Sequence, residues 1–95
     1  MPAQLRIYTI NKGEMDAFLK HFKEEVAATH EKIGYPILST YVNRPQNEFV
    51  WIRGYKDEAD RDAKNKAFQE ACAAAGIKLG ANVAKMEIRE LTEAF

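Results

Sequence analysis

The spacing of apolar residues changes along this chain in one order: strand, helix, strand, strand, helix, strand. Residues 4–10 alternate with the period of two that is typical of a strand, whereas residues 14–33 repeat apolar side chains at three- and four-residue steps. Gly34 suits the position after a helix, where φ is positive, and Pro36 prevents the helix from continuing. The later strands are predicted at 37–43, 48–55 and 83–91, and the second helix is predicted to end near Ala75.

The two central strands are joined by a short turn, Arg44–Asn47, and are therefore expected to form an antiparallel hairpin. Asp57 is expected to cap the second helix through its side-chain oxygen. Two strand–helix–strand halves connected by a hairpin predict one α+β domain, residues 1–95, with a ferredoxin-like fold: a four-stranded antiparallel sheet with two helices on one face. The second helix should lie close to the sheet, because its expected inner face is rich in alanine: Ala63, Ala67, Phe68, Ala71 and Ala74.

Composition excludes several classes of function. Fourteen basic and fourteen acidic residues cancel, so the chain carries no electrostatic signature for nucleic acid or for an anionic membrane surface. No apolar run is long enough to span a membrane and no signal peptide is evident, so a cytoplasmic location is expected. Cys72 is the only cysteine, which rules out a disulfide within the chain, and no metal-ligand spacing is present, so no metal site is expected.

The size of the chain favours self-association. A domain of 95 residues buries only roughly 60–65% of its unfolded surface, so its stability needs additional burial. With disulfides and metals excluded, pairing with a second copy of the chain is the expected source of this additional burial. The predicted partner is therefore the same chain, in a homodimer.

The strands offer two candidate faces, and the helices can cover only one of them. Medium-sized aliphatic residues are preferred in a helix–sheet core, so that set is expected under the helices: Leu5, Ile7, Leu38, Thr40, Val42, Val50, Ile52, Met86 and Ile88. The alternate set is expected to face the partner, and it holds five aromatic residues together with charged ones: Arg6, Tyr8, Tyr41, Phe49, Trp51, Arg53, Tyr55 and Glu87.

Aromatic residues and arginine are enriched at interfaces and in binding pockets, which favours a covered face. Two other interpretations stay open: a solvent-facing sheet with scattered aromatics, and a sheet that stacks on RNA bases. The basic glycine–aromatic signature of RNA-recognition sheets is missing, because the third strand reads EFVWIRGY. The zero net charge also argues against RNA.

Three segments carry a family resemblance: QLRIYTINKGEMDAFLKHF at the start, then EKIGY, and NEFVWIRGYKDEADRDA in the middle. In this order and spacing they resemble the NIPSNAP family, within the dimeric α+β barrel superfamily, over nearly the whole chain. Two histidines that are common in the family are absent from this chain. Ile33 stands where a histidine often precedes the glycine that ends the first helix. In the third strand, Trp51–Ile52–Arg53 replaces a common histidine–leucine–tryptophan sequence. The resemblance implies that two subunits set their sheets face to face to close a barrel. The matching residues in the middle segment are Asn47, Glu48, Tyr55, Asp57, Asp60 and Arg61.

The first functional hypothesis is a homodimeric binding module that holds a small, partly aromatic or carboxylated molecule between the two sheets. Aromatic walls would come from Tyr8, Tyr41, Phe49 and Trp51. Arg6 or Arg53 would meet an anion or a carbonyl of the ligand. The competing interpretation of these arginines is a buried ion pair with Glu87 across the sheet.

The second hypothesis is a cofactor-independent monooxygenase or isomerase, a function that the superfamily includes. Such chemistry needs an acid or base beside a shielded pocket, and the candidates are Tyr8, Tyr41, Glu87 and, at the pocket rim, His30. A haem enzyme would need His30 as the axial ligand. A barrel filled completely by side chains would instead indicate a structural role. No cofactor is expected for this chain.

Overall fold

The computed structural model describes all residues, 1–95, and its elements follow the predicted order. The first helix runs without interruption from α1 (Met15–His21) through a π-helical segment, η1 (Phe22–Ala27), to α2 (Ala28–Ile33). The second helix is α3 (Glu58–Ala75). The strands are β1 (Ala3–Ile10), β2 (Ile37–Asn43), β3 (Glu48–Gly54) and β4 (Val83–Leu91).

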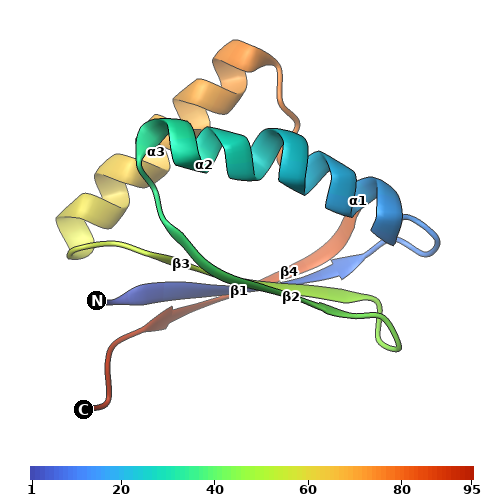
Figure 1. Cartoon of the computed structure of the whole chain (residues 1–95), viewed down its shortest axis with the longest axis horizontal. Coiled ribbons are helices and arrows are strands. Elements are labelled where there is room, and N and C mark those ends of the chain that lie inside the picture. Colours follow the sequence, from blue (N-terminus) through green and yellow to red (C-terminus); the bar gives the residue numbers. More distant parts are fainter.

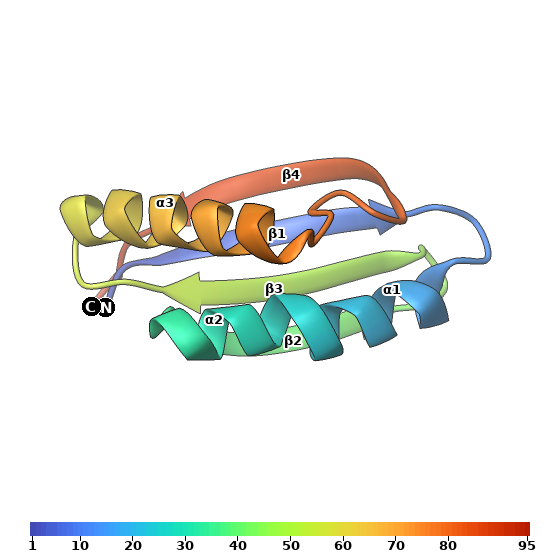
Figure 2. The ribbon, with the colours of Figure 1, turned by 90° about the horizontal axis from the view of Figure 1, so that it is seen from above.

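The four strands form one antiparallel sheet in the order β2-β3-β1-β4. Both helices lie on the same face of this sheet (Figure 1). Seen from above, α1 and α2 follow β2 and β3, whereas α3 follows β1 and β4 (Figure 2). The predicted ferredoxin-like arrangement is therefore confirmed. None of the helices combines the length and the apolar character that a membrane span requires.

The helix ends follow the predicted local chemistry. Gly34 has a φ of +76°, and the peptide N–H of Tyr35 donates to the carbonyl oxygen of His30, which closes the end of α2. At the start of α3, the carboxylate of Asp57 accepts a hydrogen bond of 2.8 Å from the N–H of Asp60. Both boundary predictions are confirmed.

The aromatic residues of β1 and β3 face the helices, so the predicted assignment of the two faces is wrong for these central strands. It is correct for β4 and for Thr40, Tyr41 and Val42 of β2. Phe49 packs against Phe22 with ring centroids 4.7 Å apart, and Trp51 lies 5.1 Å from the same ring. Tyr8 packs edge-on against Phe18 of α1 at 6.0 Å. The buried core is therefore the layer between the helices and the aromatic side of the sheet: Tyr8, Ile10, Met15, Phe18, Phe22, Val26, Tyr35, Phe49, Trp51, Tyr55, Phe68 and Cys72.

Large side chains fill the layer between the helices and the sheet. The C-terminal end of α3 stands farther from the sheet than its N-terminal end (Figure 1). Phe68 of α3 and Trp51 of β3 both pack against the ring of His30, with ring centroids 4.3 and 5.2 Å apart. The expected alanine face of α3 is also wrong in part, because Ala63 and Ala74 are exposed and the buried positions are Phe68 and Cys72.

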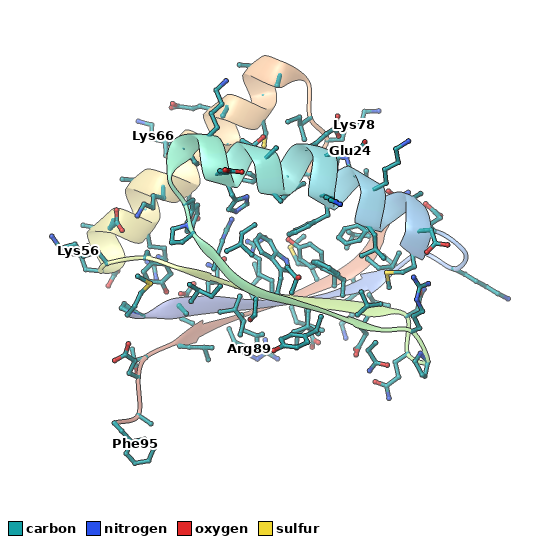
Figure 3. The ribbon with its side chains drawn as sticks, viewed as in Figure 1. Glu24, Lys56, Lys66, Lys78, Arg89 and Phe95 are labelled. Carbon is teal, nitrogen blue, oxygen red and sulfur yellow. The ribbon has the colours of Figure 1, made fainter.

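The face without helices, called the open face below, carries the aliphatic residues of the two central strands. Leu5 pairs with Ile52 and Ile7 pairs with Val50 across β1 and β3, and all four are half-buried. Arg89 projects on this side, away from the helices (Figure 3). On the outer strands β2 and β4, the residues of the open face include Leu38, Tyr41, Lys85, Glu87 and Arg89. Thr40, Val42, Met86 and Ile88 lie on the helix side by register, as predicted.

Candidate functional site

Strand register places two arginines side by side under the helices. Arg6 on β1 is directly opposite Trp51 on β3, and Gln4 is opposite Arg53. All four residues have the same parity in the sheet, so their side chains share the helix-covered face. Arg53 is only 3% exposed and Gln4 only 4%, whereas Arg6 is half-buried.

One glutamine oxygen holds both guanidinium groups. The Oε1 atom of Gln4 accepts hydrogen bonds from the Nε of Arg6 at 2.8 Å and the Nε of Arg53 at 3.0 Å. The Nη1 of Arg6 donates to the hydroxyl oxygen of Tyr8 at 2.8 Å, and the Nη1 of Arg53 donates to the Nε2 of His30 at 3.1 Å. The Nη2 atom of each arginine makes no hydrogen bond within the subunit and is not sealed from solvent.

The two arginines have no counter-charge. Neither Arg6 nor Arg53 forms an ion pair with a carboxylate, and their hydrogen-bond acceptors are all neutral groups. Burial, and then the positive charge of Arg6, lower the pKa of Arg53 to about 10. Aromatic faces give partial compensation, because the Cζ of Arg53 lies 4.6 Å from the ring centroid of Tyr35 and 5.2 Å from that of Trp51. A buried arginine without a paired acid is unusual in proteins.

His30 is a neutral residue that orients Arg53. Because arginine only donates, the Nε2 of His30 must be the acceptor, so the proton of the ring is on Nδ1. Nδ1 donates to the carbonyl oxygen of Val26 at 2.8 Å. Burial lowers the pKa of His30 from 6.5 to about 4, and the charge of Arg53 contributes to this shift. Both ring nitrogens are occupied, and this leaves no lone pair for proton transfer or for a metal.

Two adjoining hollows surround the arginines on the β4 side of the molecule. Their volumes are about 60 and 90 Å³, and both are lined by Arg6, Arg53, Phe68 and Leu79. They are called the arginine pocket below. Trp51 also lines the smaller hollow, and its buried indole N–H is the one buried side-chain polar atom of the chain without a hydrogen-bond partner. The other apolar lining residues are Tyr8, Phe18, Phe22, Val26, Ala81, Val83 and Met86.

A larger groove of about 580 Å³ lies on the opposite side of the aromatic layer, between the first helix and strand β2. It is called the β2 groove below. Phe22, Phe49 and Tyr35 form its apolar floor, and its charged residues, Lys23 and Glu31, are exposed. Phe22 lines both the β2 groove and the arginine pocket, so its ring helps to separate them.

The structure brings together some of the predicted site residues and separates others. Arg6, Tyr8, Trp51 and Arg53 line the arginine pocket, while Phe49 and His30 line the β2 groove. Tyr41 and Glu87 belong to the open face, because Tyr41 pairs with Val50 and Glu87 with Ile7. A shared face for all of them was therefore a wrong prediction, and so was a site between two sheets lined by the aromatic residues.

The predicted alternative of an ion pair between the arginines and Glu87 is also wrong. Glu87 lies within 4 Å of Lys85 and Arg89 on the open face, on the far side of the sheet from Arg53. Sequence reasoning missed Gln4, which holds both guanidinium groups, and Leu79, which lines both hollows from the loop before β4. Gln4 has the same parity as Arg6 along the strand, and this alternation could have placed it on the face of the arginines. No sequence pattern identified Leu79.

Comparison with known proteins places the fold in a class. An uncharacterised NIPSNAP domain protein from Burkholderia xenovorans superposes with a TM-score of 0.87 at 18% identity, over 99% of this chain and 95% of that one. A putative antibiotic biosynthesis monooxygenase from Nitrosomonas europaea gives 0.68 at 12% identity over the full length of both chains. A MhuD mutant with two manganese protoporphyrin IX molecules bound per active site gives 0.74 at 14% identity, over 100% and 96% of the chains.

These likenesses define the subunit fold of the dimeric α+β barrel proteins that resemble antibiotic biosynthesis monooxygenases. Within that class the chain belongs to the NIPSNAP family, whose profile matches residues 3–90. No curated protein matches the sequence. His30, the one buried histidine, has both ring nitrogens in hydrogen bonds, so it could ligate a porphyrin iron only if one of these bonds broke.

Proposed function

We propose that this NIPSNAP protein is a homodimeric binding protein that holds a small, partly aromatic or carboxylated molecule in the arginine pocket. The observation that carries the proposal is the pair of arginines at the pocket, Arg6 and Arg53, whose Nη2 atoms make no hydrogen bond within the subunit and lie beside aromatic walls. Apolar lining with a few convergent polar groups is the usual composition of a small-molecule site. The pocket lies between the helices and the sheet of one subunit.

The dimer part of the proposal rests on the open face. The subunit exposes 6090 Å², whereas a monomeric protein of 10.8 kDa typically exposes about 5,500 Å². Exposed apolar side chains at this face include Leu38 and Tyr41, beside the half-buried Ile52 and Val50. A second copy with its open face against this one would bury them. Light scattering at micromolar concentration should give twice the chain mass, and a stable monomer would overturn this part.

Binding is tested with small aromatic probes. Trp51 is the only tryptophan, so its fluorescence reports on the pocket directly. Benzyl alcohol, benzamide and benzoate are titrated into the wild type, and a saturable change is expected for at least one of them. Ala81→Phe, which fills the arginine pocket, should abolish the change, whereas Thr40→Phe in the β2 groove should preserve it. The reverse pattern, or no saturable response to any probe, would refute binding in this pocket.

A second candidate function is a cofactor-independent monooxygenase or isomerase, and one contact favours it. The hydroxyl of Tyr8 lines the pocket and receives a hydrogen bond from the cationic Nη1 of Arg6, an arrangement that suits transfer of its proton. Tyr41 and Glu87 are on the open face and His30 has no free nitrogen, so Tyr8 is the remaining candidate. Oxygen uptake in the presence of a polyhydroxylated aromatic substrate should fall to the buffer rate in Tyr8→Phe. If the wild type consumes oxygen no faster than buffer alone, the monooxygenase function is refuted.

A further inference from the structure

Two guanidinium groups meet at the arginine pocket without an acceptor for all of their donors. Each guanidinium uses its Nε and Nη1 on neutral protein acceptors and keeps Nη2 free. Gln4 fixes this arrangement, because its single oxygen bonds both Nε atoms while its amide nitrogen donates to the Oε1 of Glu90 at 2.8 Å. The free donors are therefore held in place before any ligand arrives.

The charge of the pocket selects an anion. Two positive charges that share one neutral acceptor repel each other, and burial makes that repulsion stronger than it would be in water. Glu90, the nearest acid in the hydrogen-bond network, is turned to Gln4 and to the hydroxyl of Tyr55. A bound anion would remove the repulsion and accept the free donors at once.

The shape and lining of the pocket select a carboxylate with a small apolar body. Arginine donors match the flat, two-oxygen geometry of a carboxylate. Phe68, Leu79 and Met86 make the wall of the smaller hollow mainly apolar, and Asn65 and Gln69 add only neutral amides to the larger one. Neither hollow is lined by a lysine or a third arginine, which would supply the further positive charge that suits a multiply charged phosphate. The hollows of about 60 and 90 Å³ are on the scale of the ~150 Å³ cavity that admits benzene elsewhere, so the body is limited to about one ring.

We propose that the arginine pocket binds a small monocarboxylic acid as its anion, with the carboxylate between the free Nη2 atoms of Arg6 and Arg53 and the apolar body against Phe68 and Leu79. This inference rests on the proposed binding function and deepens it by naming the ligand class. Gln4 is a positioning residue, because it acts through the two arginines rather than on the ligand.

The first arm of the test compares matched probes on the wild-type protein. Benzoate and benzamide have nearly the same shape, and charge-assisted hydrogen bonds should make benzoate bind at least about tenfold more tightly. Raising the salt concentration should weaken the binding of benzoate and leave the binding of benzamide unchanged. Inorganic phosphate serves as the competing anion and should displace benzoate poorly. The larger acid 1-naphthoate should bind more weakly than benzoate.

The second arm uses Arg6, which is half-buried and so tolerates substitution better than Arg53. Arg6→Gln should lose the preference for benzoate over benzamide, and Arg6→Lys should retain part of it. Without ligand, Arg6→Gln should keep or raise the melting temperature, because it removes one of two repelling charges; a merely structural arginine would lower it. The matched control is Arg44→Gln, an exposed arginine in the turn between β2 and β3.

The outcomes separate the two proposals. Equal binding of benzoate and benzamide would refute the carboxylate assignment and leave the binding function intact. Displacement of benzoate by millimolar phosphate would replace the carboxylate with a phosphate ligand. A preference for benzoate that survives Arg6→Gln would place the anion elsewhere. Failure of all probes, neutral and charged, would refute the binding function itself.

Discussion

His30 should make the stability of this protein depend strongly on pH below neutrality. Burial lowers its pKa from 6.5 to about 4 in the folded chain. Between these two values the unfolded chain binds a proton at His30 that the folded chain does not bind, so the free energy of unfolding falls as the pH falls. Each pKa unit corresponds to about 1.4 kcal/mol, and the full shift therefore removes roughly 3 kcal/mol between pH 7 and pH 4.

His30→Gln isolates this contribution from the carboxylates that titrate in the same range. A glutamine oxygen can accept from the Nη1 of Arg53, and its amide can donate to the carbonyl of Val26, but the side chain does not titrate. At pH 7 the variant should be less stable by about 1–2 kcal/mol, because glutamine leaves space where the imidazole packs 4.3 Å from the ring centroid of Phe68. By pH 4.5 this difference should disappear or reverse.

Urea unfolding at fixed protein concentration, followed by the fluorescence of Trp51, measures the free energy at each pH. Phe68→Leu is the control, because it loosens the packing around the same imidazole and removes no titratable group. That variant should keep the wild-type slope between pH 7 and pH 4.5. Parallel pH profiles for the wild type and His30→Gln would refute the assignment of a neutral, buried imidazole.

Three further outcomes follow from individual contacts. Asp57→Ala removes the acceptor for the N–H of Asp60 and should cost about 1 kcal/mol in urea unfolding; an unchanged midpoint would mean that the cap contributes nothing. Phe22→Ala empties the space between Phe49 and Trp51 and should cost about 3–5 kcal/mol, so a loss under 1 kcal/mol would contradict the packing. Added haem should give no Soret band of a histidine-ligated porphyrin; such a band, if lost in His30→Gln, would show that His30 can leave Arg53.

Local sequence chemistry predicted the elements well because their signals are local. The periodic stripe of residues 14–33, the glycine that follows it and the carboxylate before α3 each act over a few residues, and each appears in the fold as expected. Alternation likewise grouped Arg6, Tyr8, Trp51 and Arg53 on one face. What alternation could not provide was which face the helices cover, because period two is symmetric between the faces.

Long-range geometry decided the rest. A register shift between Ile37 and Ser39 changes which residues of β2 share a face with Phe49, so Tyr41 is separated from the aromatic set. The aromatic core joins side chains of β1 and β3 to side chains of both helices, and such long-range contacts leave no local pattern in the sequence. Gln4 shares the parity of Arg6, but its contact with Arg53 depends on strand pairing. Leu79 reaches the arginines through a loop that leaves no pattern in the sequence.

A substitution on the open face should distinguish the two sides of the sheet by experiment. Ile52 is half-buried in the subunit and pairs with Leu5, so a carboxylate at this position can still reach water in a monomer. Between two open faces the same carboxylate would be buried without a partner. Ile52→Asp should therefore weaken the dimer by about 2–5 kcal/mol, or roughly 30- to several-thousand-fold in its dissociation constant.

The measurement is the molar mass by light scattering across a dilution series, with circular dichroism to confirm that the variant folds. Lys66→Asp is the matched control, because Lys66 is exposed on α3 and projects away from the sheet (Figure 3). The expected result is a folded Ile52→Asp monomer of 10.8 kDa beside a dimeric control. A dimeric Ile52→Asp protein would place the interface elsewhere. Its apolar open face would then need a different explanation, because a solvated sheet face is normally polar.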